Sequence, residues 1–104
     1  MQKVLVDRFI VPEESRTQFL EVTRKVQRIL KTFPGFVEGY LYERKEGESR
    51  SDFMTTAVWE SEAAFENAKK AAGAEFKKQG FNPQETTRTL KIETKRAIYE
   101  RSPY

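Results

Sequence analysis

The segment that most constrains this chain runs from Gly35 to Ala68 and places two β-rich stretches directly before a helix. Tyrosine, valine, phenylalanine, threonine and tryptophan crowd the stretches Phe36–Arg44 and Asp52–Trp59, and such residues favour strands. The intervening sequence KEGESRS is rich in turn-forming residues. Ser61 can cap the following helix through its hydroxyl group. The segment therefore predicts a strand, a hairpin turn, a strand and a helix, in that order.

The sequence before this segment supplies a first strand and a first helix. Lys3–Val11 is rich in β-branched residues and predicts a strand. From Pro12 onward, apolar residues recur every three or four positions as far as Phe33, which predicts an amphipathic helix of about five turns. Pro34 and Gly35 then end that helix.

The second half of the chain predicts a weaker helix, a loop and a long strand. The helix that follows the capping serine carries an apolar stripe as far as Phe76, and Gly73 weakens it by about 1 kcal/mol relative to alanine. The sequence from Gly80 to Pro83 is typical of a loop. Arg88–Arg101 predicts a last strand, and a shift in its apolar alternation suggests a bulge near Lys95-Arg96.

The predicted strands are apolar on both faces. In the first strand Asp7 shares a face with Leu5, Phe9 and Val11, whereas Arg8 shares the other face with Val4, Val6 and Ile10. Alternation in the second strand places Phe36, Tyr40 and Tyr42 on one face. We expect one α+β, ferredoxin-like domain over residues 1–104, a four-stranded antiparallel sheet with two helices on one face. The uncovered apolar face predicts a homodimer whose sheets pack face to face.

Composition excludes several classes of site. The chain has no cysteine and no histidine, which removes disulfides, thiolate metal sites, cysteine nucleophiles and the usual ligand of zinc and haem. No purely apolar run exceeds three residues, so we expect no membrane span, and no signal peptide is recognisable. We therefore expect a cytoplasmic protein.

The net charge of +3 is mild, and its densest basic group lies late in the first predicted helix. This group consists of Arg24, Lys25, Arg28 and Lys31, and it complements the helix dipole as a solvated face. Nucleic acid is the alternative partner. The RNA-recognition motif shares the predicted strand order, but its glycine- and aromatic-rich signature is missing from the third strand, DFMTTAVWE. We therefore expect no nucleic-acid binding.

Taken together, these parts resemble the antibiotic biosynthesis monooxygenase family over nearly the whole chain. The resemblance rests on VDRFIVPEES, FPGFVEGYLYE and TTAVWESEAAFENA. In the last of these, a strand ends in Trp59-Glu60-Ser61 and a helix follows with Phe65 one turn on. The resemblance implies a dimeric α+β barrel with ferredoxin-like subunits. These motifs identify the fold better than the chemistry, because related folds host several activities.

Haem-degrading members of this fold share an asparagine in the first strand, then a tryptophan and an iron-binding histidine around the second helix. The matching positions here are Asp7, the neighbourhood of Ala68 and the neighbourhood of Lys78, and the chain has no histidine. We therefore do not expect haem degradation.

The remaining chemistry that the resemblance implies is oxygenation of phenolic, quinol or anthrone-type substrates by O2 without metal, flavin or other cofactor. Such a site deprotonates an acidic aromatic molecule, stabilises the anion and excludes water, and the anion then reacts with oxygen. The candidate residues are Asp7 as the base, Arg96 or Arg8 as partner of the anion, and Tyr40, Trp59 and Phe65 as aromatic walls for a small aromatic substrate.

Each candidate also has a structural interpretation. Trp59 can anchor the end of its strand, Tyr40 and Phe65 can be plain core, and Arg96 can pair with Asp7 to fix the sheet. A carboxylate among apolar neighbours is either paired with a cation or partly desolvated, and desolvation makes it a stronger base. Two functions therefore stay open: a cofactor-free monooxygenase, or a non-oxygenase of the same fold acting as an isomerase, an auxiliary protein or a small-molecule binder.

Overall fold

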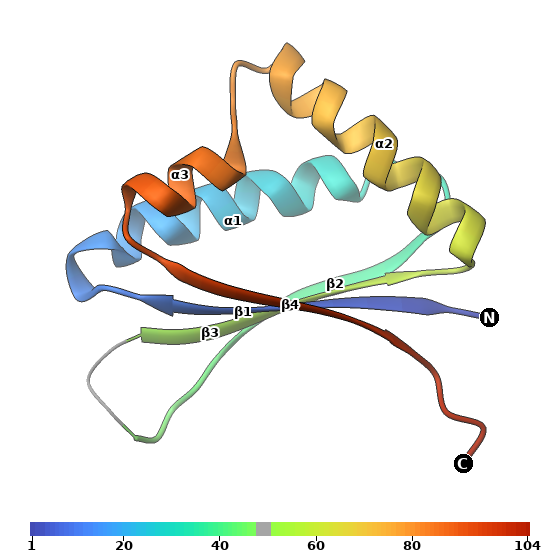
Figure 1. The fold of residues 1–104 in the computed structure, drawn as a ribbon, viewed down its shortest axis with the longest axis horizontal. Helices are drawn as coiled ribbons and strands as arrows, with labels where there is room; N and C mark the ends of the chain where they lie inside the picture. Colours follow the sequence, from blue (N-terminus) through green and yellow to red (C-terminus); the bar gives the residue numbers. More distant parts are fainter. Residues whose placement is uncertain (48–50) are drawn as a thin grey trace.

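Four antiparallel strands form one sheet, and the helices lie on one side of it (Figure 1). The computed structural model describes residues 1–47 and 51–104. In chain order the elements are β1 (Lys3–Val11), the short 3-10 helix η1 (Glu13–Ser15), α1 (Arg16–Leu30), β2 (Phe36–Glu43), β3 (Ser51–Trp59), α2 (Glu62–Lys78), α3 (Pro83–Thr89) and β4 (Glu93–Glu100). The predicted α+β, ferredoxin-like fold is confirmed. Part of the predicted hairpin turn, residues 48–50, lies outside the described residues.

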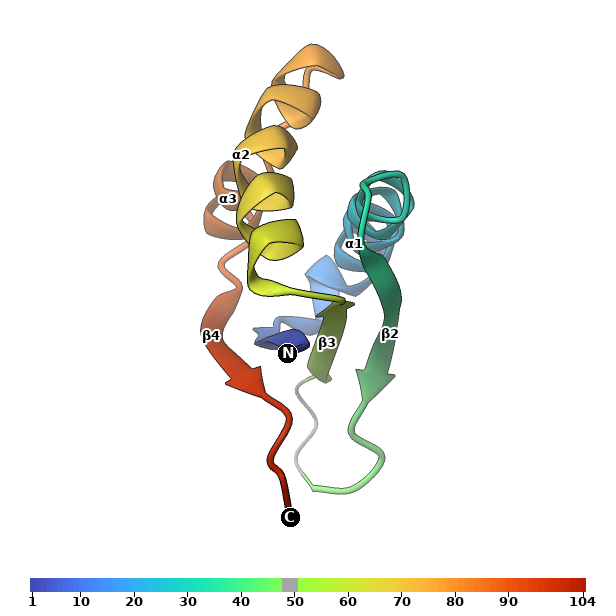
Figure 2. The same ribbon diagram turned by 90° about the vertical axis from the view of Figure 1, so that its right-hand side faces the viewer.

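The strand order β2-β3-β1-β4 places β1 inside the sheet, with β2 and β4 at its edges. Antiparallel pairing sets Asp7 opposite Thr55 of β3 on one side and opposite Arg96 of β4 on the other. Figure 2 shows α1 above β2 and β3, and α2 above β4. Two segments that are distant in sequence, β1 and β4, thus bring Asp7 and Arg96 together.

The hydrophobic core lies between the sheet and the helices. Leu5, Phe9 and Val11 pack on this side, as predicted from the face they share with Asp7. One buried cluster contains Ala57, Trp59, Phe65 and Ala68, and the other contains Val11, Phe19 and Phe53. Full burial of one large apolar side chain stabilises the fold by roughly 1.5–3 kcal/mol. These clusters fix α1 and the start of α2 on the sheet.

The other face of the sheet carries exposed aromatic side chains. Tyr40, Tyr42 and Tyr99 are 53%, 49% and 56% exposed. Tyr40 and Tyr42 pair with Thr56 and Met54, which alternate with the buried positions of β3 and so point away from the helices. No described helix covers this face.

The prediction of a fourteen-residue last strand over Arg88–Arg101 is wrong, because α3 occupies Pro83–Thr89 and β4 begins at Glu93. The side chain of Asn82 caps α3 by accepting a hydrogen bond from the amide of Glu85 at 3.1 Å. Pro83 at the first helical position needs no amide partner. These start signals outweigh the β preference of the threonine-rich sequence that follows. The sheet therefore carries three α-helices rather than the predicted two.

The bulge predicted near Lys95-Arg96 is also wrong. The register between β1 and β4 is continuous from Lys3 opposite Glu100 to Ile10 opposite Glu93. A register shift lies instead in β2, between Phe36 and Glu38. The prediction that Phe36 shares a face with Tyr40 and Tyr42 fails for this reason, since Phe36 packs against Trp59 on the helix side.

The first helix is shorter than predicted, and the second climbs away from the sheet. A 3-10 turn follows Pro12, so α1 starts only at Arg16 and ends at Leu30. Both ribbon views show α2 rising from the sheet toward its C-terminal end. Phe65 and Ala68 are accordingly buried, whereas Phe76, two turns later, is partly exposed. Among the described residues, no helix has both the length and the apolar character to cross a membrane.

An ion pair fastens the start of α1 to the end of the β2–β3 hairpin. Arg16 donates hydrogen bonds to both carboxylate oxygens of Glu43 and, at 3.1 Å, to the hydroxyl oxygen of Ser51. The guanidinium carbon also lies 5.2 Å from the centre of the Phe53 ring. The hydrogen bonds from Arg16 lower the pKa of the Glu43 carboxyl group from 4.5 to about 2. This contact therefore stabilises the charged form of Glu43 in the folded chain.

We predict that Glu43→Gln lowers the melting temperature at pH 7 but not at pH 2. The pair contributes stability above the unfolded-state pKa near 4.5 and loses that contribution as the pH falls toward the folded-state pKa of about 2. Melting of both proteins between pH 2 and pH 7 measures the difference. A difference that stays constant over this range would contradict the assignment.

We predict that Gly73→Ala raises the free energy of unfolding by about 1 kcal/mol, because Gly73 lies inside α2 and alanine has the higher helix propensity. A Cβ atom at Gly73 would meet nothing within 4 Å. Gly35→Ala is the matched control: Gly35 has φ +84° and a Cβ there would collide with Cβ of Ala64. The free energy of unfolding of this control, measured by urea unfolding, should fall by roughly 2 kcal/mol. Destabilisation by Gly73→Ala would refute the propensity argument.

Candidate functional site

Asp7 and Arg96 form a two-point ion pair in the middle of β1 and β4. Arg96 donates from Nε to Asp7 Oδ1 at 2.8 Å and from Nη2 to Oδ2 at 3.1 Å. Both side chains lie on the helix-side face, because Asp7 shares it with Leu5 and Phe9. Two parallel hydrogen bonds fix the guanidinium and the carboxylate relative to each other. The contact between these two candidates, predicted as the structural interpretation, is therefore present.

The two partners differ in their access to solvent. The Asp7 residue is 8% exposed, whereas the side chain of Arg96 is 58% exposed at the edge of the sheet. The hydrogen bonds to Asp7 raise the pKa of the Arg96 guanidinium above its ordinary value, so this group stays positively charged. A buried carboxylate thus lies behind an exposed cation.

Trp59 and Phe65 lie in one core cluster, at the end of the sheet where β3 leads into α2. Trp59 is 2% exposed, and its ring meets Phe36 edge-on with 5.3 Å between ring centres. The indole Nε1 is buried and has no hydrogen-bond partner among the described residues. Ser61 begins α2 directly after this strand by accepting a hydrogen bond from the amide of Ala64 at 3.1 Å. Trp59 and Phe65 are therefore on the same side of the sheet as Asp7.

Tyr40 is separated from the other candidates. It lies on the helix-free face, and its ring centre is 6.3 Å from that of Tyr42. The sheet itself stands between Tyr40 and the helix-side residues Trp59 and Phe65. Within one chain, Tyr40 cannot form a wall of the same site. Arg8, offered as an alternative anion partner, is also on this face, where it donates to Asp52 Oδ2 at 3.3 Å.

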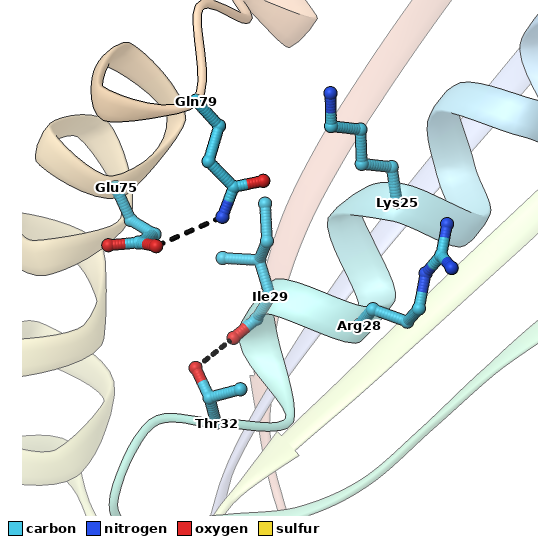
Figure 3. Close-up of a pocket in the computed structure, with 6 residues that line it drawn as sticks. All are labelled: Lys25, Arg28, Ile29, Thr32, Glu75 and Gln79. Atoms are coloured by element: carbon cyan, nitrogen blue, oxygen red, sulfur yellow. Dashed lines mark hydrogen bonds between the residues drawn. The ribbon is translucent and has the colours of Figure 1, made fainter.

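Two clefts open between the helices. The first, of about 500 Å³, lies between the C-terminal halves of α1 and α2 and is lined by Lys25, Arg28, Ile29, Thr32, Glu75 and Gln79 (Figure 3). The second, of about 320 Å³, lies beside the start of α2, with Phe33, Ala64, Asn67 and Ala68 among its lining residues. Neither cleft is lined by any of the predicted candidates, which are Asp7, Arg96, Trp59, Phe65 and Tyr40.

Sequence reasoning assigned Lys25 and Arg28 to a solvated helix face and did not predict the cleft between α1 and α2. The available signal was their spacing with Ile29 and Thr32, which puts Lys25, Arg28 and Ile29 near one side of α1 and Thr32 in the turn that follows it. The facing residues, Glu75 and Gln79, were beyond prediction because the tilt of α2 decides where they lie. In the described parts of the chain, no cluster of three or more acidic, histidine or cysteine residues could hold a metal ion.

The family model described as antibiotic biosynthesis monooxygenase matches residues 4–78. That range spans β1, α1, the β2–β3 hairpin and α2. No curated protein sequence matches the chain significantly.

Solved structures of similar fold cover almost the entire chain. SnoaB, a cofactor-independent oxygenase from Streptomyces nogalater, is 22% identical with a TM-score of 0.72, covering 99% of this chain and 95% of its own. A conserved protein from Methanosarcina mazei is 14% identical with a TM-score of 0.76, covering 98% and 94%. A heme-degrading protein from Mycobacterium tuberculosis is 23% identical with a TM-score of 0.57, covering 66% and 78%. At these identities the likeness shows the fold.

Proposed function

This chain belongs to the antibiotic biosynthesis monooxygenase family, and we propose that it is a cofactor-independent monooxygenase that oxidises small phenolic, quinol or anthrone-type molecules with O2. The observation that carries the proposal is the pairing of a buried carboxylate, Asp7, with the exposed guanidinium of Arg96. The likeness of fold to a cofactor-independent oxygenase supports it.

The proposed chemistry needs a base and a partner for the anion that the base creates. Asp7 accepts the acidic proton of the substrate, and Arg96, whose positive charge does not depend on pH in the neutral range, stabilises the resulting anion. The electron-rich anion then reacts directly with O2. In the case of an anthrone, one oxygen atom becomes the carbonyl oxygen of the oxidised carbon, and the other leaves as water with the two hydrogens that this carbon loses. Trp59 and Phe65 contribute apolar surface on the same side of the sheet, which helps to exclude water.

A second function is favoured by the geometry of the ion pair itself. Both Asp7 oxygens accept hydrogen bonds from Arg96, and neither described cleft includes Asp7 among its lining residues. An ion pair held in this way can simply join β1 to β4. The chain would then be a non-oxygenase of the same fold, an isomerase, an auxiliary protein or a small-molecule binder.

The proposal includes a homodimer built on the helix-free face of the sheet. That face carries Val4, Val6, Ile10, Met54, Val58 and the exposed Tyr40, Tyr42 and Tyr99. Exposed apolar and aromatic surface of this extent is typical of a protein–protein interface. Tyr40 acts in this proposal at the interface rather than beside Asp7.

We predict that Asp7→Asn abolishes oxygen uptake with an anthrone or a quinol while the protein stays folded. Asparagine keeps the shape of the side chain and removes the base. The free energy of unfolding should fall by roughly 1–3 kcal/mol, because a part-buried charge-assisted pair becomes a neutral contact beside a guanidinium that solvent already reaches. An oxygen electrode and urea unfolding measure the two effects.

Asp52→Asn is the matched control, since Asp52 also accepts a hydrogen bond from an arginine but on the other face of the sheet. This control should keep its turnover. Undiminished turnover in Asp7→Asn would end the proposal that Asp7 is the base. Loss of stability in that variant, without any activity in the parent protein, would favour the non-oxygenase function.

We predict that Val6→Glu converts the dimer into a monomer at micromolar concentration. Val6 lies on the helix-free face, opposite Thr56 of β3 and Ala97 of β4, so glutamate would bury a charge in the interface. Ala74→Glu adds the same charge on an exposed position of α2 and should leave the mass unchanged. Light scattering measures the mass. A monomeric parent protein would contradict the dimer.

A further inference from the structure

We infer that the cleft between the C-terminal halves of α1 and α2 binds the anionic end of a small aromatic carboxylate. The cleft has a volume of about 500 Å³, within the range of roughly 300–1,000 Å³ that is usual for small-molecule sites. Lys25 and Arg28 line it from α1, and Glu75 and Gln79 line it from the C-terminal end of α2, while the Arg28 guanidinium is turned away from α2 (Figure 3). The positive charges of Lys25 and Arg28 select an anionic ligand, and the apolar side chain of Ile29 lies beside them.

Among residues 1–47 and 51–104, the cations of the cleft have no carboxylate partner. No described carboxylate lies within ion-pairing distance of Lys25 or Arg28. The one acidic residue of the lining, Glu75, accepts a hydrogen bond from the side-chain amide of Gln79 at 2.9 Å (Figure 3). A ligand carboxylate can therefore take the position that no protein carboxylate fills.

The surroundings of the cleft strengthen its positive potential. Arg24 and Lys31 lie on the same part of α1, and Lys77 and Lys78 lie in the last turn of α2. These four side chains are exposed, so each acts on the cleft through solvent and is screened by salt. Their sum favours anions over neutral molecules near the cleft.

Apolar and aromatic groups adjoin the same cations. Ile29, which lines the cleft, is 6% exposed. The Lys25 Nζ atom lies 4.6 Å from the centre of the Phe81 ring, and that ring meets Phe76 edge-on at 5.4 Å. Phe81 is held there by a tight helix end, where its amide donates to the carbonyl oxygen of Phe76 at 2.9 Å after Gly80 with φ +69°. A flat apolar body beside an anionic group fits this arrangement.

This inference does not depend on the proposed function, because neither Asp7 nor Arg96 lines this cleft. Binding at the cleft does not itself require turnover, so binding and oxygen uptake test the two ideas separately.

The experiment compares binding of 1-hydroxy-2-naphthoate and neutral 1-naphthol by isothermal titration calorimetry. We expect the carboxylate to bind the parent protein about tenfold more tightly or better, as one charge-assisted hydrogen bond provides. The double variant Lys25→Gln/Arg28→Gln should lose this preference. Glu75→Gln should strengthen carboxylate binding several-fold, because it removes the negative charge of the lining and keeps its shape. Added salt should weaken carboxylate binding in the parent protein.

The double variant Lys69→Gln/Lys70→Gln is the matched control. It removes two exposed charges from α2 at positions outside the cleft lining, and it should keep the preference for the carboxylate. If both double variants lost the preference for the carboxylate to the same extent, the site would be overturned and a diffuse basic surface would be indicated. Equal binding of the two naphthalenes by the parent protein, or no gain in Glu75→Gln, would also overturn it.

Thermal melting of each variant checks that it is folded, and Arg28→Lys, which keeps the charge, should retain most of the preference if the double variant is unstable. Binding of the carboxylate without oxygen uptake on any substrate would keep the site and remove the proposed function. Oxygen uptake with neutral anthrones and no preference for carboxylates would keep the proposed function and remove the site.

Discussion

The structure depends on a single constraint, that β1 is an inner strand with apolar side chains on both faces. The chain's own helices cover one of these faces, which holds Leu5, Phe9 and Val11. A shift of one residue in register would exchange Asp7 and Arg8 between the faces and turn every apolar companion with them. The position of Asp7, its ion pair with Arg96 of β4 and the apolar face that no described helix covers all follow from this one register.

Much of the fold was predictable because its signals are local in sequence. The hairpin of β-rich stretches, the capping Ser61 and the three- and four-residue periodicity of α1 act over a few residues each. The face of Asp7 was also predictable, since strict alternation in β1 leaves no other choice. Its contact with Arg96 could be named in advance because a last strand rich in β-formers must pair with an exposed edge of the sheet.

The parts that could not be predicted depend on competition between signals or on the packing of distant segments. Three of the seven residues of α3 (PQETTRT) are threonines, which favour strands, whereas the Asn82 cap and Pro83 favour the helix that forms instead. The register shift after Phe36 places Tyr40 on the opposite face from Trp59, which alternation cannot reveal. The cleft between α1 and α2 exists because α2 tilts away from the sheet, and no periodicity encodes that tilt.

The ion pair occupies both carboxylate oxygens of Asp7, and it is still compatible with the proposed reaction when charges are counted. Before proton transfer, Arg96 faces one anion, the Asp7 carboxylate. Afterwards Asp7 is neutral and the negative charge resides on the substrate, so the guanidinium again faces one anion and the net charge of the site is unchanged. Because the Arg96 side chain is 58% exposed, it can follow the charge outward without leaving a buried ion unpaired. Asp7 and Arg96 must therefore pair in the same way whether they only link β1 to β4 or also act as a base and the partner of the substrate anion.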